Sequence, residues 1–490
     1  MSTNRPFYSR AVTRQIVLGE AGQTAVFALF ILINTLVLSN AIRHYPLVGY
    51  DAPDHVAYIL TLAQGRLPTL ADTVEFFSPP LPYSFPALAR YWADGRLAVT
   101  AAAKIAQLQN WLISLAVTWL LVKITQLARP GRWSFSAAAL AWLGVLPVYY
   151  KTLAFVRGEP WVMLFALLIA WELLRLAVGE TAVPRKRDAL RTGLWLGLGI
   201  LSRQWAFLLF PAVGLFMLLL WRKGKSAPSA DFSSWFQAGL VMLGAAALIG
   251  GWFYGYLYRQ YGALTAFNRA PSAQFSLGNQ PLDFYLGAGD GQLFRDPVRP
   301  HFANQLLPKL YAELWGDHEA YFLVTGQDKR SGAWLPGWKL EKALSQTPLP
   351  AWLQTNRWQI APYLGLVNRI ALLPTLFLLA AVLWNGRALR IIWRRQASPA
   401  DWLAALSLFI LLFSAAGYLW FLIQYPMPDK GDTIKATYLL HVYPFSAILA
   451  ANWMAQWRGR HPRFYRAVWV MLLLTAVAAA PLWLSRYTNF

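Results

Sequence analysis

Apolar runs of about 20 residues recur along this 490-residue chain and limit its fold more than any other feature. An α-helix needs a run of that length to cross the hydrocarbon core of a bilayer. The strict alternation of an outer-membrane barrel does not occur in the sequence. The sequence therefore predicts an all-α protein that crosses a membrane many times.

The composition supports this prediction. The chain is 57% hydrophobic and 13% charged, whereas a soluble chain carries about 25% charged residues. The first run is too long for the apolar core of a signal peptide, so we expect an uncleaved anchor. About 11 spans are expected, over residues 22–42, 106–127, 134–150, 159–178, 189–202, 204–222, 235–258, 367–385, 402–424, 436–455 and 466–486.

The charge distribution predicts how these spans are oriented. The chain has 44 basic and 22 acidic residues, a net charge of +22. With a cytoplasmic N-terminus and alternating spans, the basic side chains collect in cytoplasmic loops, as is usual in membrane proteins. An odd number of spans then places the C-terminus outside. These loops explain the positive charge without a nucleic-acid partner. These loops and their edges hold Arg129, Arg132, Arg185, Lys186, Arg187, Arg191, Arg222, Lys223, Lys225, Arg387, Arg390, Arg394, Arg395, Arg458, Arg460, Arg463 and Arg466.

The absence of cysteine excludes disulfides, thiolate metal sites and cysteine nucleophiles, and suits a bacterial inner membrane.

Two long segments lie outside in this topology. The first is an outer loop at residues 43–105, within an N-terminal module that we expect over residues 1–258. We expect C-terminal helices over residues 367–490. Between these lies an outer cap at 259–366, with helical patterns near 302–315 and 340–353, whose many Trp and Tyr residues suit a membrane interface.

The first outer loop contains an amphipathic pattern. A helix is plausible from Pro53, because proline is favoured in a first turn. Its apolar face is formed by Val56, Ile59, Leu60 and Ala63. Asp51, Asp54 and Tyr58 fall on the opposite side, with His55 on its flank. We expect this helix to lie flat on the membrane, with its polar edge toward a cleft between the spans.

Purely structural roles are also open to these residues. Asp51 stands where a helix N-cap would bind backbone amides. His55 alone is more often a hydrogen-bonded structural histidine than a base. The prolines at 79, 80 and 82 could simply form a rigid turn.

The order of features is more specific than any one of them. Asp51 is followed by His55, a Gly-x-Leu-Pro at 65–68 and a Pro-Pro-Leu-x-Tyr at 79–83. This order resembles the first extracytoplasmic loop of GT-C fold glycosyltransferases, the polyprenyl-phosphate-sugar-dependent enzymes related to protein mannosyltransferases and aminoarabinose transferases. The resemblance implies that Asp51 is the general base of an inverting transfer. The supporting and orienting residues would be Asp54, His55, Glu75, Tyr83 and Glu159.

The chain departs from that family at one position. Ala52 replaces the second acid of the usual Asp-Glu pair. A site with one acid binds a divalent cation poorly, so the resemblance leaves the need for a metal open.

Several basic side chains should also face outward at the same depth in the membrane. Such a cluster of positive charge predicts a site that binds an anion. A lipid-linked phosphate fits, because arginine binds phosphate oxygens in bidentate fashion. Any one of these basic residues, considered by itself, could instead extend its side chain to the lipid headgroups. We expect Asp51, Arg203 and Arg369 to converge on one outward cavity within about 15 Å. The predicted phosphate-binding residues are Arg157, Arg203, Arg369, Lys435 and Tyr438.

These residues predict a glycosyltransferase that moves a sugar from a polyprenyl-phosphate donor to an extracytoplasmic glycan, lipid or protein. One alternative is a transporter or flippase of a lipid-linked glycan. It would require broken helices and paired repeat halves, neither of which is evident in the sequence. A non-catalytic membrane assembly protein is the other alternative.

Overall fold

A computed structural model describes residues 10–179, 184–224, 232–265, 267, 269–394 and 396–488. The first nine residues, whose sidedness the sequence predicts, lie outside this part. The first half of the described chain forms α1 Arg10–Arg43, α2 Ala52–Leu62, α3 Leu81–Trp92, α4 Val99–Ala128, α5 Trp133–Gly144, α6 Pro147–Ala154, α7 Glu159–Val178, α8 Lys186–Ile200, α9 Leu209–Gly224, α10 Phe232–Ala246 and α11 Trp252–Tyr261. The remainder forms α12 Leu282–Leu286, α13 Leu306–Trp315, β1 Gly326–Asp328, α14 Gly337–Leu344, β2 Leu353–Thr355, α15 Arg357–Asn385, α16 Arg387–Trp393, α17 Pro399–Gln424, α18 Tyr443–Arg460 and α19 Pro462–Ala479.

The fold class is the one predicted, an all-α membrane protein, but the count of 11 spans is not confirmed. Within the described residues, eight helices are long and apolar enough to cross a membrane. A ninth crossing exists if α5 and α6, which meet at 65°, are counted as one span. The predicted span 189–202 falls mostly in α8, which ends at Ile200 and whose 15 residues reach only about 22 Å at 1.5 Å per residue. Residues 436–455 begin as a 3-10 helix and continue into α18.

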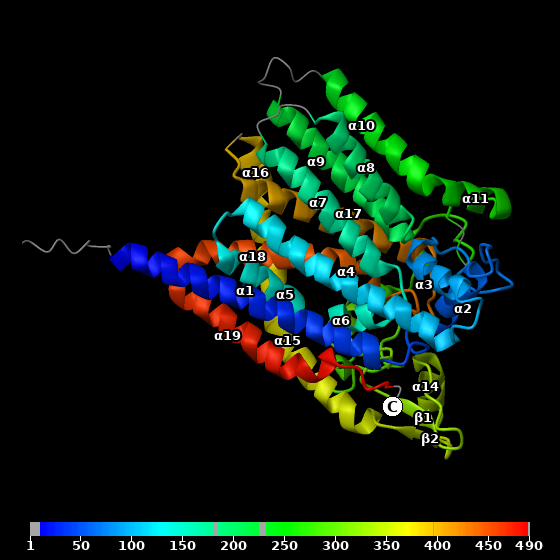
Figure 1. The fold of residues 1–490 in the computed structure, drawn as a ribbon. Helices are drawn as coiled ribbons and strands as arrows, with labels where there is room; N and C mark the ends of the chain where they lie inside the picture. The colour runs from blue at the N-terminus through cyan, green and yellow to red at the C-terminus, as the bar shows by residue number, and fades with distance from the viewer. Residues whose placement is uncertain are drawn as a thin grey trace, which may run out of the picture.

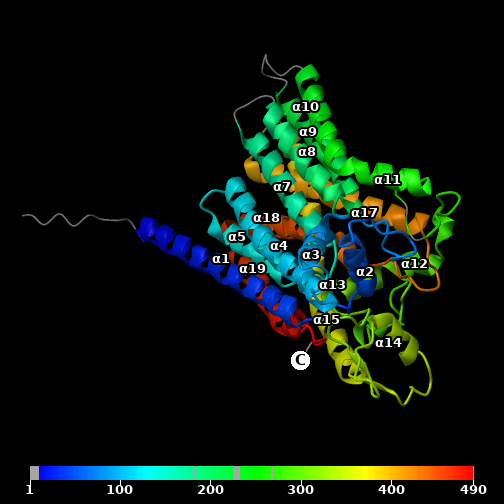
Figure 2. The ribbon, with the colours of Figure 1, turned by 45° about the vertical axis from the view of Figure 1, so that its right-hand side comes forward.

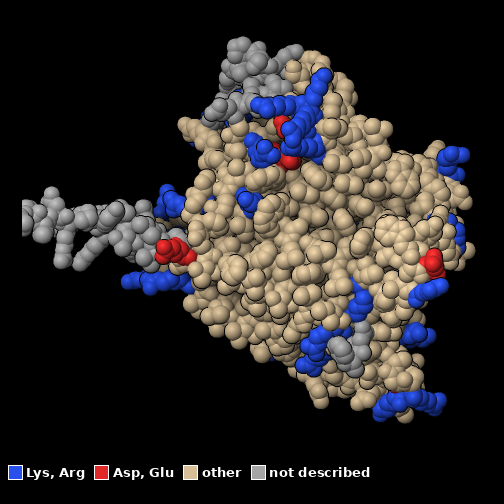
Figure 3. Space-filling model, in the orientation of Figure 1, with Lys and Arg blue, Asp and Glu red and all other residues tan. Residues whose placement is uncertain are grey.

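The helices form a fan whose two ends differ (Figure 1). One end carries α2, α3, α14 and the β1–β2 pair, together with the last described residues. A backbone bridge between His44 and Thr488 ties those residues to the end of α1. The start of α1 lies at the opposite end, and a turned view shows α12, α13 and α14 gathered at the first end (Figure 2). On the face in Figure 3, charged side chains keep mostly to the periphery and leave a broad uncharged band, as a membrane-spanning surface requires.

The first outer loop folds largely as expected, but α2 does not present its apolar face to lipid. Val56 and Ile59 are buried against α3 and α4. Tyr58, predicted on the polar side, is fully buried and packs on Tyr83 with ring centroids 4.4 Å apart. The prediction of a helix lying flat on the membrane is therefore corrected: α2 is a core helix of the outer end, because α3 supplies a second apolar surface.

The outer cap is organised around the carboxylate of Asp317, which is 1% exposed. It accepts hydrogen bonds from four successive backbone amides, at Tyr321, Phe322, Leu323 and Val324, over 2.6–3.0 Å. The pattern near 302–315 is realised as α13. The pattern near 340–353 is shorter than expected, because α14 ends at Leu344, and prolines at 348 and 350 precede β2.

We expect Asp317→Ala to destabilise the cap by roughly 3–5 kcal/mol, since four buried amides would lose a charged acceptor. The measurement is the thermal unfolding midpoint of the purified protein in detergent. Asp328→Ala is the matched control, because Asp328 accepts from two amides in an exposed turn. Equal midpoints for the two variants would contradict this role.

Candidate functional site

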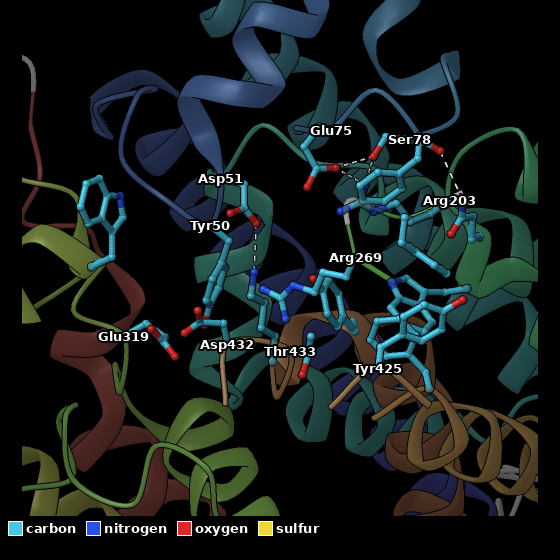
Figure 4. A pocket seen from close by; sticks show the side chains of 18 of the residues that line it. Tyr50, Asp51, Glu75, Ser78, Arg203, Arg269, Glu319, Tyr425, Asp432 and Thr433 are labelled. Atoms are coloured by element: carbon cyan, nitrogen blue, oxygen red, sulfur yellow. Dashed lines mark hydrogen bonds and ion pairs between the residues drawn. The ribbon is translucent and has the colours of Figure 1, made fainter. Parts of the chain in front are cut away.

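A cavity of about 200 Å³ opens at the outer end of the bundle, between the first outer loop, the cap and the segment after α17 (Figure 4). It collects charged and aromatic side chains from distant parts of the chain. The lining residues are Tyr50, Asp51, Glu75, Phe77, Ser78, Pro79, Arg203, Gln204, Trp205, Phe267, Arg269, Arg299, Glu319, Tyr321, Trp338, Phe421, Tyr425, Asp432, Thr433, Lys435 and Tyr438.

Asp51 stands at the N-cap of α2, but its side chain does not cap the helix. Its backbone has φ 52°, in the left-handed region that Asp tolerates better than most residues. The side chain is thus free to reach Lys435, whose Nζ donates to Oδ2 at 2.9 Å. The capping alternative is therefore wrong. Oδ1 makes no hydrogen bond within the described chain and remains available to a ligand.

The ion pair also sets the protonation of both groups. Burial raises the pKa of Asp51, but the charges of Lys435 and Arg157 outweigh burial and hold this pKa below its usual range. Burial lowers the pKa of Lys435, and Asp51 more than offsets this, so the pKa lies above its usual range. Asp51 is therefore a carboxylate, and Lys435 an ammonium, at neutral pH.

Arg203 lines the cavity with its charge already compensated. Its guanidinium donates to Glu75 at 2.9 Å, to Glu159 at 3.1 Å and to Ser78. Arg157 forms a bidentate pair with Glu159, at 2.9 Å for both bonds. Burial raises the pKa of Glu75, but Arg203, His55 and the hydrogen bond from Ser78 together outweigh burial, so this pKa falls below its usual value. Two cations and two anions thus form a buried network with no net charge.

His55 and Tyr83 support the site from behind and do not line it. Tyr83 Oη lies 2.9 Å from His55 Nδ1, and both side chains are buried. Burial lowers the pKa of His55 to about 4, so the ring is neutral at pH 7. Asp54 also lies off the cavity, where Thr73 donates to its backbone and side chain at 3.0 and 3.3 Å.

The prediction that Arg369 converges on this cavity is wrong. Asn368 points into the protein, where its amide donates to the Leu293 carbonyl at 2.8 Å. The next residue on a helix is rotated by about 100°, and Arg369 is accordingly exposed on the outside of α15. Arg157 does not line the cavity either, although it lies 5.3 and 5.4 Å from the Tyr50 and Tyr438 rings, which do.

The cap contributes charged residues that no motif had singled out. Arg299 forms ion pairs with Glu319 at 2.9 Å and with Asp432 at 2.5 Å. Arg269 has a buried guanidinium nitrogen with no hydrogen-bond partner in the described chain. These residues lie in loops without helical or strand periodicity, so the sequence offered no signal that would place them beside Asp51.

The donor set does not fit a divalent cation. Asp51 is the only carboxylate of the opening motif in this position, and the ammonium of Lys435 occupies its Oδ2. Within the described residues, no group of three or more His, Cys, Asp or Glu side chains is arranged to hold a metal ion.

No family model matches the chain, and no curated protein matches it by sequence. The fold is similar to the oligosaccharyltransferase of Archaeoglobus fulgidus in its apo form, with a TM-score of 0.44 and 14% identity, over 94% of this chain and 55% of that one. The same archaeal protein, AglB, in complex with an inhibitory peptide and a dolichol-phosphate, gives a TM-score of 0.44 at 13% identity, over the same shares of the two chains.

A second kind of protein also matches. ArnT from Cupriavidus metallidurans, bound to undecaprenyl phosphate, gives a TM-score of 0.36 at 14% identity, over 89% of this chain and 79% of that one. The chain spans about half the length of the archaeal oligosaccharyltransferase. With TM-scores below 0.5, these likenesses assign neither a substrate nor a catalytic residue to this chain.

Replacing Lys435 should shift the titration of Asp51. In Lys435→Met, burial is no longer offset by the largest opposing charge, so the pKa of Asp51 should rise by about 1–3 pH units. The measurement is the carboxyl stretching absorption as a function of pH, with Asp51→Asn subtracted to isolate this group. Lys435→Arg keeps the charge and should titrate close to the unmodified protein. A pKa of Asp51 that is the same in the Met and Arg variants would contradict this origin of the shift.

Proposed function

We propose that this chain is a membrane glycosyltransferase that moves a sugar from a polyprenyl-phosphate donor to an extracytoplasmic acceptor, with inversion at the anomeric carbon. One observation carries the proposal. A single outer cavity is lined both by an ionised carboxylate with one free oxygen, Asp51, and by Arg269, which has a guanidinium nitrogen without a hydrogen-bond partner in the described part of the chain. These are the two charges that a sugar transfer from phosphate needs, a proton acceptor and an anion site.

The charge balance of the lining supports a phosphate at Arg269. Four lining acids face four lining cations. Three of the cations, Arg203, Arg299 and Lys435, are held in ion pairs. Arg269 is the fourth. Arg269 is half-buried, and its buried guanidinium nitrogen has no partner in the described chain; leaving such a donor unsatisfied is costly, and a phosphate oxygen would relieve that cost. We therefore assign the donor phosphate first to Arg269, with Arg203 and Lys435 bordering it as originally predicted.

The aromatic part of the lining supports a lipid-borne donor. Phe77, Trp205, Phe267, Phe421 and Tyr425 gather at one end of the cavity. Trp205 and Phe421 belong to the candidate spans Gln204–Lys223 and Pro399–Gln424, so this end borders the membrane. A polyprenyl chain can remain in the bilayer while its phosphate enters the cavity here.

The proposed orientation follows from the positive-inside rule. The turns at the end of the fan opposite the cavity carry the clustered Lys and Arg residues of the predicted cytoplasmic loops. The cavity would then face the extracytoplasmic side of an inner membrane, with the N-terminus in the cytoplasm and the C-terminus outside.

In the proposed reaction, an acceptor hydroxyl hydrogen-bonds to Asp51 Oδ1 and attacks the anomeric carbon from the side opposite the phosphate. The new carbon–oxygen bond forms as the bond to the phosphate oxygen breaks, and Asp51 takes the hydroxyl proton. Lys435 keeps Asp51 ionised but makes it a weak base. This suffices because the hydroxyl becomes acidic only as its bond to carbon forms. The charge of the leaving phosphate develops beside Arg269.

One observation bears on the transporter alternative. No broken helix is evident in the sequence, yet α5 and α6 form one, bent by 65°. Broken helices in transporters present their ends to the substrate. No residue from 133–154 lines the cavity, and the buried Lys151 of α6 instead binds Glu313 at 2.8 Å. This break therefore does not favour transport over transfer.

Asp51→Asn should lower the rate of sugar transfer by about 10²–10⁴-fold, the usual contribution of a general base. The assay uses the full-length protein in nanodiscs, with undecaprenyl-phosphate-linked sugars as donors and an extract of cell-envelope acceptors. Asp72→Asn is a control, since Asp72 binds Arg66 and Thr69 in the same loop, away from the cavity. Full turnover by Asp51→Asn would refute Asp51 as the base.

Arg269→Gln should weaken donor binding by about tenfold or more, because a phosphate would lose a charged partner. The measurement is the affinity for undecaprenyl phosphate by microscale thermophoresis, in which no turnover is needed. Arg369→Gln is the matched control and should bind as the unmodified protein does, because Arg369 faces away from the cavity. If Arg369→Gln weakened binding more than Arg269→Gln, the phosphate assignment would be wrong.

A further inference from the structure

The two ends of the cavity differ in chemistry, and the Asp51–Lys435 pair lies between them. From Lys435, aromatic contacts run one way through Tyr438 and Trp205 to Phe421, with successive rings 4.8 and 4.9 Å apart. This is the end that borders the membrane. Figure 4 shows Arg203 and Tyr425 on that side of Asp51, and Glu319 on the other.

In the opposite direction from Lys435, a second series of contacts leads into the cap. Lys435 Nζ lies 4.9 Å from the centroid of the Tyr50 ring, and the Tyr50 and Tyr321 rings are 5.0 Å apart. Gly337 packs so closely here that a Cβ would lie 2.0 Å from the Glu319 carbonyl oxygen and 2.9 Å from the Tyr321 ring. That approach brings the next residue, Trp338, to the cavity, where its side chain remains 56% exposed.

The cap end is rich in hydrogen-bond acceptors. Asp432 is held at Oδ1 by Arg299, while its side chain is still 31% exposed. Arg299 also binds Glu319 and Glu341, and Lys309 binds Glu319 at 2.5 Å. Two positive and three negative groups therefore meet here. This end favours a ligand that donates hydrogen bonds, in contrast to the Arg269 region, which favours an anion.

We propose that the cap end is the acceptor subsite and that the acceptor is a saccharide. This inference rests on the proposed glycosyl transfer and narrows its acceptor. A sugar ring has an apolar C–H face, which can pack on the exposed indole of Trp338, and hydroxyl groups, which can donate to Asp432. Tyr321 completes the wall next to Tyr50, so that a ring seated there would direct a hydroxyl toward Asp51.

Other acceptor classes fit this end less well. Adding a strand to a sheet edge is one common way in which an extended peptide binds, and neither β1 nor β2 contributes a residue to the described lining. A lipid acceptor would need continuous apolar surface, but this end is lined by Arg299, Glu319, Asp432 and Thr433 beside its aromatic rings. The position of Trp338 on α14, in the cap and beyond the candidate spans, favours a ligand that arrives from water.

The test is binding of the fluorescently labelled full-length protein to a printed microbial glycan array. The unmodified protein should bind a subset of the glycans. Trp338→Ala should lower that signal about tenfold or more, since a stacked aromatic side chain at a binding site is commonly worth that much. Trp338→Tyr should restore most of it, because the ring face is kept. Trp92→Ala is the matched control: Trp92 is 72% exposed at the end of α3 and does not line the cavity.

Array binding needs neither donor nor turnover, so its failure is distinct from failure of the proposed function. A blank array, or equal signals from Trp338→Ala and Trp92→Ala, would overturn the saccharide subsite even if sugar transfer to another acceptor were measured. Binding to a printed peptide array that is lost in Trp338→Ala would also overturn it, in favour of a protein acceptor. Glycan binding that depends on Trp338, without transfer from any donor, would establish a saccharide site at the cap end but refute the proposed function, and with it the role of this site as the acceptor subsite.

Discussion

The ion pair between Asp51 and Lys435 is the interaction on which the outer end of this protein depends. It joins residues 384 positions apart in the sequence. A partly buried ion pair is favourable only when its geometry is fixed and its remaining polar atoms are satisfied. Tyr418 fixes the lysine side: its hydroxyl accepts from the Lys435 amide at 2.7 Å and donates to the Thr433 carbonyl at 2.8 Å. On the aspartate side, Tyr50 is held by Glu313.

The cap also helps to fix the position of the segment that carries Lys435. Lys309 donates to the Gly431 carbonyl at 2.8 Å, and Arg299 holds the neighbouring Asp432. Gly431 has φ 58°, and a Cβ there would lie 1.9 Å from the Ala303 carbonyl oxygen, so only glycine fits without a shift. The segment that delivers Lys435 is thus clamped between the cap and α17. Rigid support of this kind is what a reacting geometry requires.

The other charged residues at the cavity are of two kinds: some are paired with one another, and others keep an atom available to a ligand. Arg157, Glu159, Arg203 and Glu75 compensate one another and form a permanent framework beneath the cavity. Arg269 is not compensated in this way, and Asp51 keeps one oxygen free. Under the proposed function, Asp51 takes up a proton and negative charge develops on the phosphate beside Arg269, while the framework keeps its charges and orients these two residues.

The sequence alone determined the class of fold and the region of interest. Apolar runs specify membrane helices because each must bury its own backbone hydrogen bonds in lipid, a requirement local to the run. The order of motifs in the first outer loop, and the resemblance to GT-C enzymes that it carries, pointed to Asp51, Arg203, Lys435 and Tyr438. The fold then places all four in the lining of one cavity. Only the tertiary structure decided that Arg369 faces outward, that α2 is a core helix, and that Arg269 and Trp338 reach the cavity. These outcomes depend on helix rotation and on packing between distant loops, which residue spacing within a segment does not encode.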